Sequence, residues 1–278
     1  MLRPKIALLT ALLILPFGHA SADAEDDRQA LVDYYTSRFP QIELQEFANG
    51  LYAFDAGARE QWLEIEDFPP YEIAIEEGEE YFNSPFSNGK SYADCFEDAG
   101  IGIRHNFPHF DAASGEVITI ELAINQCREK NGEAPLPYKR GELAAISAYM
   151  AYTSRGNTND VEVPSDEPGA VAAYEAGKEF YYSRRGQLNF SCANCHAQSA
   201  GLMLRSDRLS ATLGQATHWP VYRAKWGEIG TLHRRFQECN EQVRSKPFDA
   251  QSEEFRNLEY FLSYMSNGLE LNGPASRR

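Results

Sequence analysis

The chain has few basic residues relative to acidic ones, and it has only one apolar run of notable length. Lys and Arg number 26 against 41 Asp and Glu, which gives a formal net charge of −15. A protein that binds nucleic acid needs a basic surface for the phosphates, so this balance argues against that function class. Beyond the N-terminus no apolar stretch approaches membrane length, so we expect no membrane span in the mature chain.

The one apolar run has the features of an export signal. Arg3 and Lys5 give a basic start, residues 6–17 are predominantly apolar, and residues 20–22 are the small residues Ala-Ser-Ala. This order predicts a secretory signal peptide over residues 1–22. An uncleaved membrane anchor is the alternative, but the run is short for crossing a bilayer.

The cysteines are few and odd in number: Cys95, Cys127, Cys192, Cys195 and Cys239. Disulfides persist in proteins that leave the cytoplasm, so an exported chain is expected to pair its thiols. An odd count leaves one thiol that needs another explanation.

Residues 192–196 read Cys-Ala-Asn-Cys-His, which is the attachment signature of a c-type haem. Two thiols three positions apart lie on one side of a helical turn, so each can add to one vinyl group of the porphyrin. Cys192 and Cys195 are therefore the predicted covalent attachment points, and His196 is the predicted axial ligand of the iron. One motif predicts one haem c. A chance motif or a redox disulfide is the alternative.

The surroundings of the motif resemble a small cytochrome c in pattern. Residues 167–182 and 253–265 both read as helices with aromatic sides, and Gly177 would permit a close crossing between helices. Two aromatic helices that cross near the haem edge are the usual cytochrome c arrangement, so we infer a mainly α fold by analogy of pattern.

The N-terminal half repeats the C-terminal half without its haem motif. The matching segments are 77–82 with 176–181, 91–96 with 191–196, and 142–156 with 254–268. Tyr92 stands where the first haem cysteine would be, and Phe96 stands where the iron histidine would be. We therefore predict two tandem cytochrome c-like domains related by internal duplication, with 23–160 lacking haem and 161–278 carrying one.

The repeat also pairs Cys127 with Cys239, at the same offset of 112 residues as the third segment pair. If Cys239 faces the haem, its equivalent Cys127 faces a pocket that no haem fills. Such a pocket can collapse, which predicts a disulfide between Cys95 and Cys127 as a replacement staple. The count then closes, with two cysteines on haem, two in a bridge and Cys239 alone.

Cys239 lies 43 residues after His196, where a cytochrome supplies its second axial ligand. The pattern favours Cys239, and a buried free thiol is the bland alternative. The competing ligands are Met203, His218, His233 and Met265.

A thiolate ligand needs nearby positive charge to stay deprotonated. Arg234, Arg235 and Arg244 are close to Cys239 in sequence, and at least one of them is expected on the solvated surface. An arginine that faces the sulfur would also bind a small sulfur oxyanion.

Three features together carry a resemblance: residues 88–96, residues 190–196, and Arg235 placed four positions before Cys239. On these the chain resembles the SoxA family, the haem subunits of the SoxAX complex in periplasmic thiosulfate oxidation. The resemblance covers essentially the mature chain. It corresponds to the monohaem type, because Tyr92 and Phe96 remove the first haem site.

The resemblance implies a function, L-cysteine S-thiosulfotransferase, and a site. Members pair with a small monohaem cytochrome, SoxX, and conjugate thiosulfate oxidatively to a cysteine of the carrier protein SoxYZ, with electrons passing through haem. Cys239 corresponds to the axial and catalytic cysteine, which occurs as a persulfide, and Arg235 corresponds to a substrate-binding residue. The implied location is the periplasm. Two other readings stay open: a plain electron carrier, with Met or His as sixth ligand, and a thiosulfate dehydrogenase that makes tetrathionate.

Overall fold

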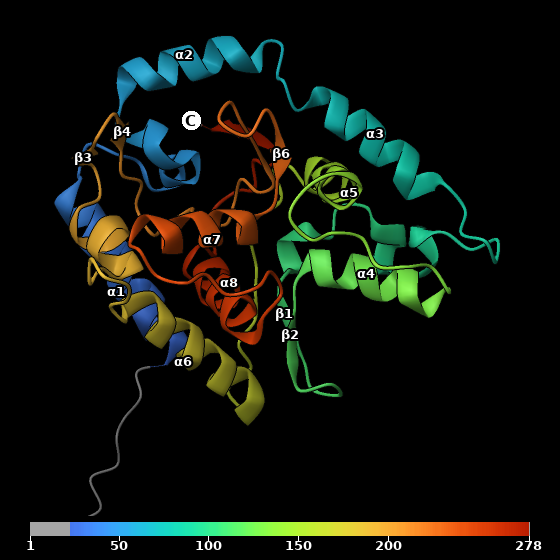
Figure 1. Cartoon of the computed structure of the whole chain (residues 1–278). Coiled ribbons are helices and arrows are strands. Elements are labelled where there is room, and N and C mark those ends of the chain that lie inside the picture. Colours follow the sequence, from blue (N-terminus) through green and yellow to red (C-terminus); the bar gives the residue numbers. More distant parts are fainter. Residues whose placement is uncertain (1–22, 278) are drawn as a thin grey trace, which may run out of the picture.

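A computed structural model of the chain describes residues 23–277, so the predicted signal peptide lies outside the described residues. The fold is mainly α, as the sequence predicts (Figure 1). The α-helices are α1 (Ala24–Arg38), α2 (Ala56–Glu66), α3 (Glu72–Asn83), α4 (Ile120–Lys130), α5 (Glu142–Tyr152), α6 (Pro168–Tyr182), α7 (Leu232–Gln242) and α8 (Glu253–Met265). Four 3-10 helical segments are η1 (Leu44–Ala53), η2 (Tyr92–Asp94), η3 (Glu97–Gly100) and η4 (Arg104–Asn106). A π-helical segment is η5 (Asn194–Gln198). The strands are β1 (His109–Asp111), β2 (Glu116–Ile118), β3 (Met203–Leu204), β4 (Asp207–Arg208), β5 (Val221–Arg223), β6 (Glu228–Gly230) and β7 (Ala275–Arg277).

The two halves contain the same helix crossing. A Cβ atom on Gly78 of α3 would lie 2.0 Å from the carbonyl oxygen of Ala145 on α5. A Cβ atom on Gly177 of α6 would likewise lie 2.0 Å from the carbonyl oxygen of Asn257 on α8. Only glycine permits either approach, since a Cβ atom needs about 3 Å or more of clearance from an oxygen. The duplication predicted from sequence is therefore present in the packing, and the close crossing predicted at Gly177 is confirmed.

A short hairpin is also duplicated, which the sequence comparison did not identify. Strand β1 pairs antiparallel with β2, with His109 opposite Ile118. Strand β5 pairs with β6 in the same register, with Val221 opposite Gly230, 112 positions later. Helices α4 and α7 follow the two hairpins at the same offset. In the second half β7 adds parallel to β5, so the sheet order is β6-β5-β7.

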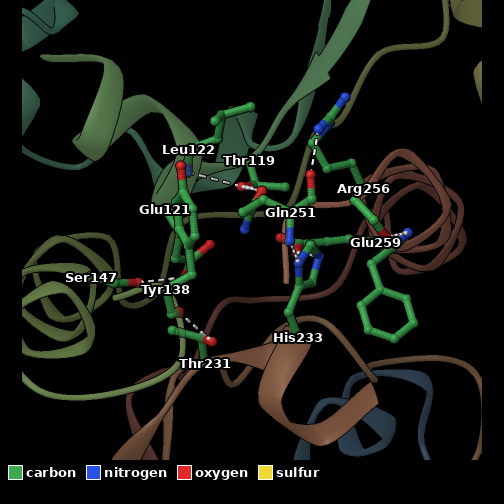
Figure 2. A network of polar contacts seen from close by, with 12 residues as sticks. Thr119, Glu121, Leu122, Tyr138, Ser147, Thr231, His233, Gln251, Arg256 and Glu259 are labelled. Carbon is green, nitrogen blue, oxygen red and sulfur yellow. Dashed lines mark hydrogen bonds and ion pairs between the residues drawn. The ribbon is translucent and has the colours of Figure 1, made fainter. Parts of the chain in front are cut away.

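The two halves meet through equivalent surfaces. Thr119, at the start of α4, donates from Oγ1 to Oε1 of Gln251 in the second half at 2.8 Å (Figure 2). Its counterpart Thr231, at the start of α7, donates from Oγ1 to the carbonyl of Tyr138 in the first half at 2.9 Å (Figure 2). Each half thus accepts a hydrogen bond from the equivalent threonine of the other half. This reciprocal arrangement resembles the isologous contact of a two-fold dimer.

Charged side chains are buried at this contact. Glu121 on α4 accepts a hydrogen bond from Oγ of Ser147 at 2.8 Å, and Nε2 of His233 on α7 lies 3.1 Å from Oε2 of Glu259 (Figure 2). Arg104 lies 3.8 Å from the other oxygen of Glu259. Burial raises the pKa of Glu121, with the charge of Arg104 opposing that shift.

The N-terminal helices pack on the second half, although they precede the first half in sequence. The side chain of Tyr35 on α1 is fully buried in one core cluster with Tyr181 of α6 and Phe261 of α8. Helix α1 lies beside α6 in Figure 1. Because the core cluster also contains Ala193 of the haem motif, residues 24–38 reach the neighbourhood of the predicted haem site.

Within residues 23–277 no helix combines the length and apolar content needed to cross a membrane.

Candidate functional site

The predicted haem motif lies on a capped turn that both halves share. Oδ1 of Asn194 accepts from the backbone nitrogen of Ser191 at 2.9 Å. In the first half, Oδ2 of Asp94 accepts from the backbone nitrogen of Ser91 at 2.7 Å. The turn therefore forms from its own cap, and the second half places thiols and an imidazole on it.

His196 is held in the protonation state that a metal ligand requires. Its Nδ1 lies 3.1 Å from the carbonyl oxygen of Ser210, which can only accept, and 3.2 Å from the Ser210 hydroxyl, so the carbonyl favours the tautomer with the hydrogen on Nδ1. Nε2 is thereby left with its lone pair. Burial lowers the pKa of His196 to about 4, so the ring is neutral near pH 7.

The three unpaired thiols come together. Cys192, Cys195 and Cys239 are free, while Cys95 and Cys127 form a disulfide with their Cα atoms 5.8 Å apart. Burial, and after it the charge on the Cys239 sulfur, raises the pKa of Cys192 to about 12. Cys239 raises the pKa of Cys195 in the same way, after burial. The structure therefore brings α7 within electrostatic reach of both motif cysteines.

This donor set fits a haem c. Two free thiols are spaced for the two vinyl groups, a neutral imidazole presents Nε2, and a third thiol approaches from a different helix. The types of donor present, two thiols, an imidazole and a third thiol, are those that a haem c needs.

The competing sixth ligands lie in different surroundings. Met265 is buried in the core cluster that also contains Ala193 of the motif, and Met203 on β3 is 51% exposed. Nδ1 of His233 accepts from the backbone nitrogen of Gln251 at 2.9 Å, in the contact between the halves. His218 and Ser210 both border Gly50, which places His218 on the Ser210 side of His196.

A single carboxylate gathers basic groups next to Cys239. Oε2 of Glu238 lies 3.2 Å from Nη1 of Arg235 and 3.6 Å from Nη1 of Arg223. Oε1 accepts from Nε1 of Trp226 at 2.7 Å and from Nζ of Lys225 at 3.1 Å. Burial opposes ionisation of Glu238, but these donors outweigh it and lower its pKa.

Arg235 and Arg223 both lie within electrostatic reach of the Cys239 sulfur. Negative charge on Cys239 is the main cause of the raised pKa of Arg235. Burial lowers the pKa of Arg223, and the nearby Arg235 lowers it further while Cys239 opposes the change. Nε of Arg223 has no hydrogen-bond partner within the described part of the chain. A small anion beside Cys239 would meet two guanidinium groups, one of which has a free donor.

The sequence analysis did not identify Arg223 as a residue of the site. It selected Arg234, Arg235 and Arg244 only because they are close to Cys239 in sequence. Arg223 ends strand β5, 16 positions before Cys239, and it is the hairpin that brings it to the site. Its equivalent in the first half is Asp111, so the repeat gave no signal for it. Arg234 binds Glu228 at 3.0 Å, and Arg244 lies on the loop after α7.

Comparison with known proteins gives the family. A family described as "SoxA/TsdA, cytochrome c domain" matches residues 77–158 and 176–271, which is more than half of the chain. The chain belongs to the SoxA/TsdA cytochrome c family. It is 54% identical over 272 residues to a protein of Allochromatium vinosum named L-cysteine S-thiosulfotransferase subunit SoxA, covering 98% of this chain and 96% of that one. A protein of the same name from Chlorobaculum tepidum is 49% identical over 281 residues, covering 98% and 96%.

A solved structure agrees in fold. The crystal structure of SoxXA from P. pantotrophus superposes with a TM-score of 0.72 at 31% identity, covering 79% of this chain and 84% of that one. The two matched segments of the SoxA/TsdA family coincide with the two duplicated halves. The matched segments begin at residue 77, so α1 lies outside them.

Helix α1 nevertheless supports the haem motif of this family member. The hydroxyl of Tyr35 donates to the carbonyl oxygen of His196 at 2.5 Å and accepts from the backbone nitrogen of Thr212 at 3.0 Å. Oγ1 of Thr212 lies 2.9 Å from the Tyr35 hydroxyl and 2.6 Å from that of Tyr181. Because the His196 carbonyl can only accept, the hydrogens run from Tyr181 through Thr212 and Tyr35 to that carbonyl.

Proposed function

We propose that this chain is the SoxA-type subunit of an L-cysteine S-thiosulfotransferase, which joins thiosulfate to a cysteine of a SoxYZ carrier protein. The observation that carries the proposal is the electrostatic proximity of Cys239 to Cys192 and Cys195, with Arg235 and Arg223 held beside it by Glu238. The close relatives that bear this enzyme name support it.

The chain would hold one haem c. Cys192 and Cys195 would attach it, and Nε2 of His196 and the Cys239 sulfur would be its axial ligands. The first half would hold none, since Tyr92 and Phe96 occupy the equivalent positions and Tyr92 is buried against Phe82 with ring centroids 5.6 Å apart. Bound haem supplies one-electron redox chemistry.

The reaction balances in two steps at Cys239. We take Cys239 to carry a persulfide, so that a second, terminal sulfur is bonded to its own sulfur. In the first step the sulfane sulfur of thiosulfate forms an S–S bond to this terminal sulfur, and two electrons go to two one-electron acceptors of the cytochrome c class. In the second step a carrier thiolate attacks the former sulfane sulfur. The new carrier S–S bond forms, the bond between the former sulfane sulfur and the terminal persulfide sulfur breaks, and the Cys239 persulfide is regenerated as an anion.

The arginines would make these encounters possible. Thiosulfate, the Cys239 sulfur and the carrier thiolate are all anionic and repel one another. Arg235 and Arg223 offset that repulsion, and Glu238 fixes both guanidinium groups from one side. Arg235 is therefore the proposed substrate-binding residue and Arg223 the second.

The proposed setting is a periplasmic heterodimer with SoxX. The predicted signal peptide supports export, and the similar solved structure is described as a SoxXA complex. Oxidation of thiosulfate to tetrathionate without a carrier is the competing activity, since the family description covers both SoxA and TsdA.

The test is a product assay on the protein co-expressed with SoxX. Thiosulfate, SoxYZ and oxidised cytochrome c are supplied, and the mass of SoxYZ and the tetrathionate concentration are measured. We expect a thiosulfonate adduct on SoxYZ, which Cys239→Ala abolishes while the haem stays attached. Low-temperature electron paramagnetic resonance should show His/thiolate ligation in wild type only. Tetrathionate formation without SoxYZ, or a His/Met spectrum, would contradict the proposal.

A further inference from the structure

Basic side chains continue outward from the substrate site to the surface. Glu228 on β6 lies 3.0 Å from Nη1 of Arg234 and 3.6 Å from Nη1 of Arg140. The guanidinium carbon of Arg234 lies 4.2 Å from the centre of the Trp226 ring, and that of Arg223 lies 5.3 Å from it. The same indole donates to Glu238. A connected series of contacts therefore runs from Arg235, four residues before Cys239 in sequence, to Arg140.

We call this group the basic cluster. Its members are Arg140, Arg223, Lys225, Trp226, Glu228, Arg234, Arg235 and Glu238. It holds five cations and two carboxylates, and Asp207 adds a third carboxylate within electrostatic reach of Arg223 and Arg235. The cluster is thus net positive in a chain whose formal charge is −15. An acidic protein that concentrates cations on one part of its surface attracts anions to that part.

The cations lie at two depths. The side chains of Arg223 and Arg235 are 12% and 26% exposed, beside the Cys239 sulfur. Those of Lys225 and Arg140 are 64% and 67% exposed. The inner pair suits a small anion such as thiosulfate. The outer pair is in water, where a small anion would gain little, so it suits the charged surface of a macromolecule.

The outermost cation comes from the half that lacks the haem motif. Arg140 precedes α5, and the neighbouring Lys139 carbonyl accepts from the backbone nitrogen of Thr231 at 3.2 Å, at the start of α7. The contact between the halves therefore carries residues 138–140 to the helix that bears Cys239. This gives the first half a part in the site that needs no haem.

We propose that Arg140 and Lys225 form the docking surface for the carrier protein, which would present acidic side chains around its reactive cysteine. The inference rests on the proposed function and identifies how the protein substrate of that site is recognised. Trp226 is half-buried, follows Lys225 in sequence and contacts Arg234, and it offers the aromatic anchor typical of protein interfaces.

The test is Arg140→Glu in the complex with SoxX, assayed with SoxYZ and, separately, with free L-cysteine as a small thiol acceptor. Arg140 contacts neither Cys239 nor Glu238 in the cluster's set of contacts, and Lys225 is left intact because it holds Glu238. We expect KM for SoxYZ to rise about three- to tenfold, as for reversal of an exposed interface charge. The values of kcat and KM for thiosulfate, and the rate with L-cysteine, should not change. Raising the ionic strength should raise KM for SoxYZ in wild type and less in the variant.

Lys130→Glu is the matched control, because it reverses an exposed cation of the same half at the far end of α4. An unchanged KM for SoxYZ in Arg140→Glu, or an equal rise in both variants, would overturn the docking surface while leaving the proposed function intact. Wild-type protein that never modifies SoxYZ would overturn the proposed function and the docking surface with it.

Discussion

Replacing Tyr35 by phenylalanine tests whether α1 positions the haem motif. The substitution removes one hydroxyl from a fully buried side chain and keeps the ring that packs against Phe47 and Phe39. It leaves the His196 carbonyl without its donor at 2.5 Å and the Thr212 backbone nitrogen without its acceptor. We expect the variant to fold and attach haem, but with a loosened turn around the axial histidine.

The magnitude follows from these two groups. Each buried polar group that loses its partner costs about 1–3 kcal/mol. Oγ1 of Thr212 also lies 3.5 Å from the His196 carbonyl and can approach it, which limits the loss. The free energy of unfolding should therefore fall by about 2–4 kcal/mol.

Tyr34→Phe is the control, since it removes a hydroxyl from the adjacent residue. The Tyr34 hydroxyl donates to the Ala197 carbonyl at 3.2 Å, but Arg38 donates to the same carbonyl at 3.0 Å. We expect its free energy of unfolding to change by less than about 1 kcal/mol. Urea denaturation gives the stabilities, and the haem midpoint potential and resonance spectrum report the ligand geometry. Equal stability in the two variants, or an unchanged potential in Tyr35→Phe, would refute the positioning role.

Three further predictions concern the duplicated frame. Gly177→Ala and Gly78→Ala should each destabilise by about 2 kcal/mol, because overpacking outweighs the gain in helix propensity, and only Gly177→Ala should alter the haem spectrum. Because the pKa of Glu121 is raised in the folded state, its contribution to the stability of the wild-type protein is present at low pH and is lost as the pH rises. The stability of Glu121→Gln should therefore increase relative to wild type above the usual carboxyl pKa of 4.5, with a slope approaching about 1.4 kcal/mol per pH unit. A difference between the urea midpoints of the two proteins that does not change with pH would contradict this prediction. Replacing Cys95 and Cys127 by alanine should cost about 3–4 kcal/mol without lowering haem content, as measured by denaturation and the pyridine haemochrome assay.

The sequence was sufficient where the signals are local. The helix expected over 253–265 has those bounds in the structure, and the one expected over 167–182 begins one residue later, with Glu167 as its cap. The haem motif and the Cys95–Cys127 disulfide follow from short patterns and from the repeat. The surrounding site depends on pairing between distant segments. Arg223 reaches Cys239 only because a hairpin folds back on α7, and no residue near it in sequence indicates that contact.

The half on which α1 packs could not be predicted from the sequence for a related reason. The domain prediction assigned residues 23–160 to the first half from sequence order alone, and the boundary itself stays a prediction. Packing gives residues 24–38 to the second half, where Tyr35 joins the core cluster of α6 and α8. A helix with three acidic residues in its first turn shows no sign in its sequence of which half it covers.

The duplication explains how one position serves two purposes. Cys127 and Cys239 occupy the same place on α4 and α7, and each lies near the motif turn of its own half. In the first half that turn carries Cys95, and the two sulfurs bond directly. In the second half both motif thiols would be consumed by haem, so Cys239 has no cysteine left to pair with. A thiol in that position would stay available for sulfur chemistry because the proposed cofactor would occupy its partners. Equivalent helices would then serve as a covalent link in the first half, on α4, and as the proposed catalytic helix in the second, on α7.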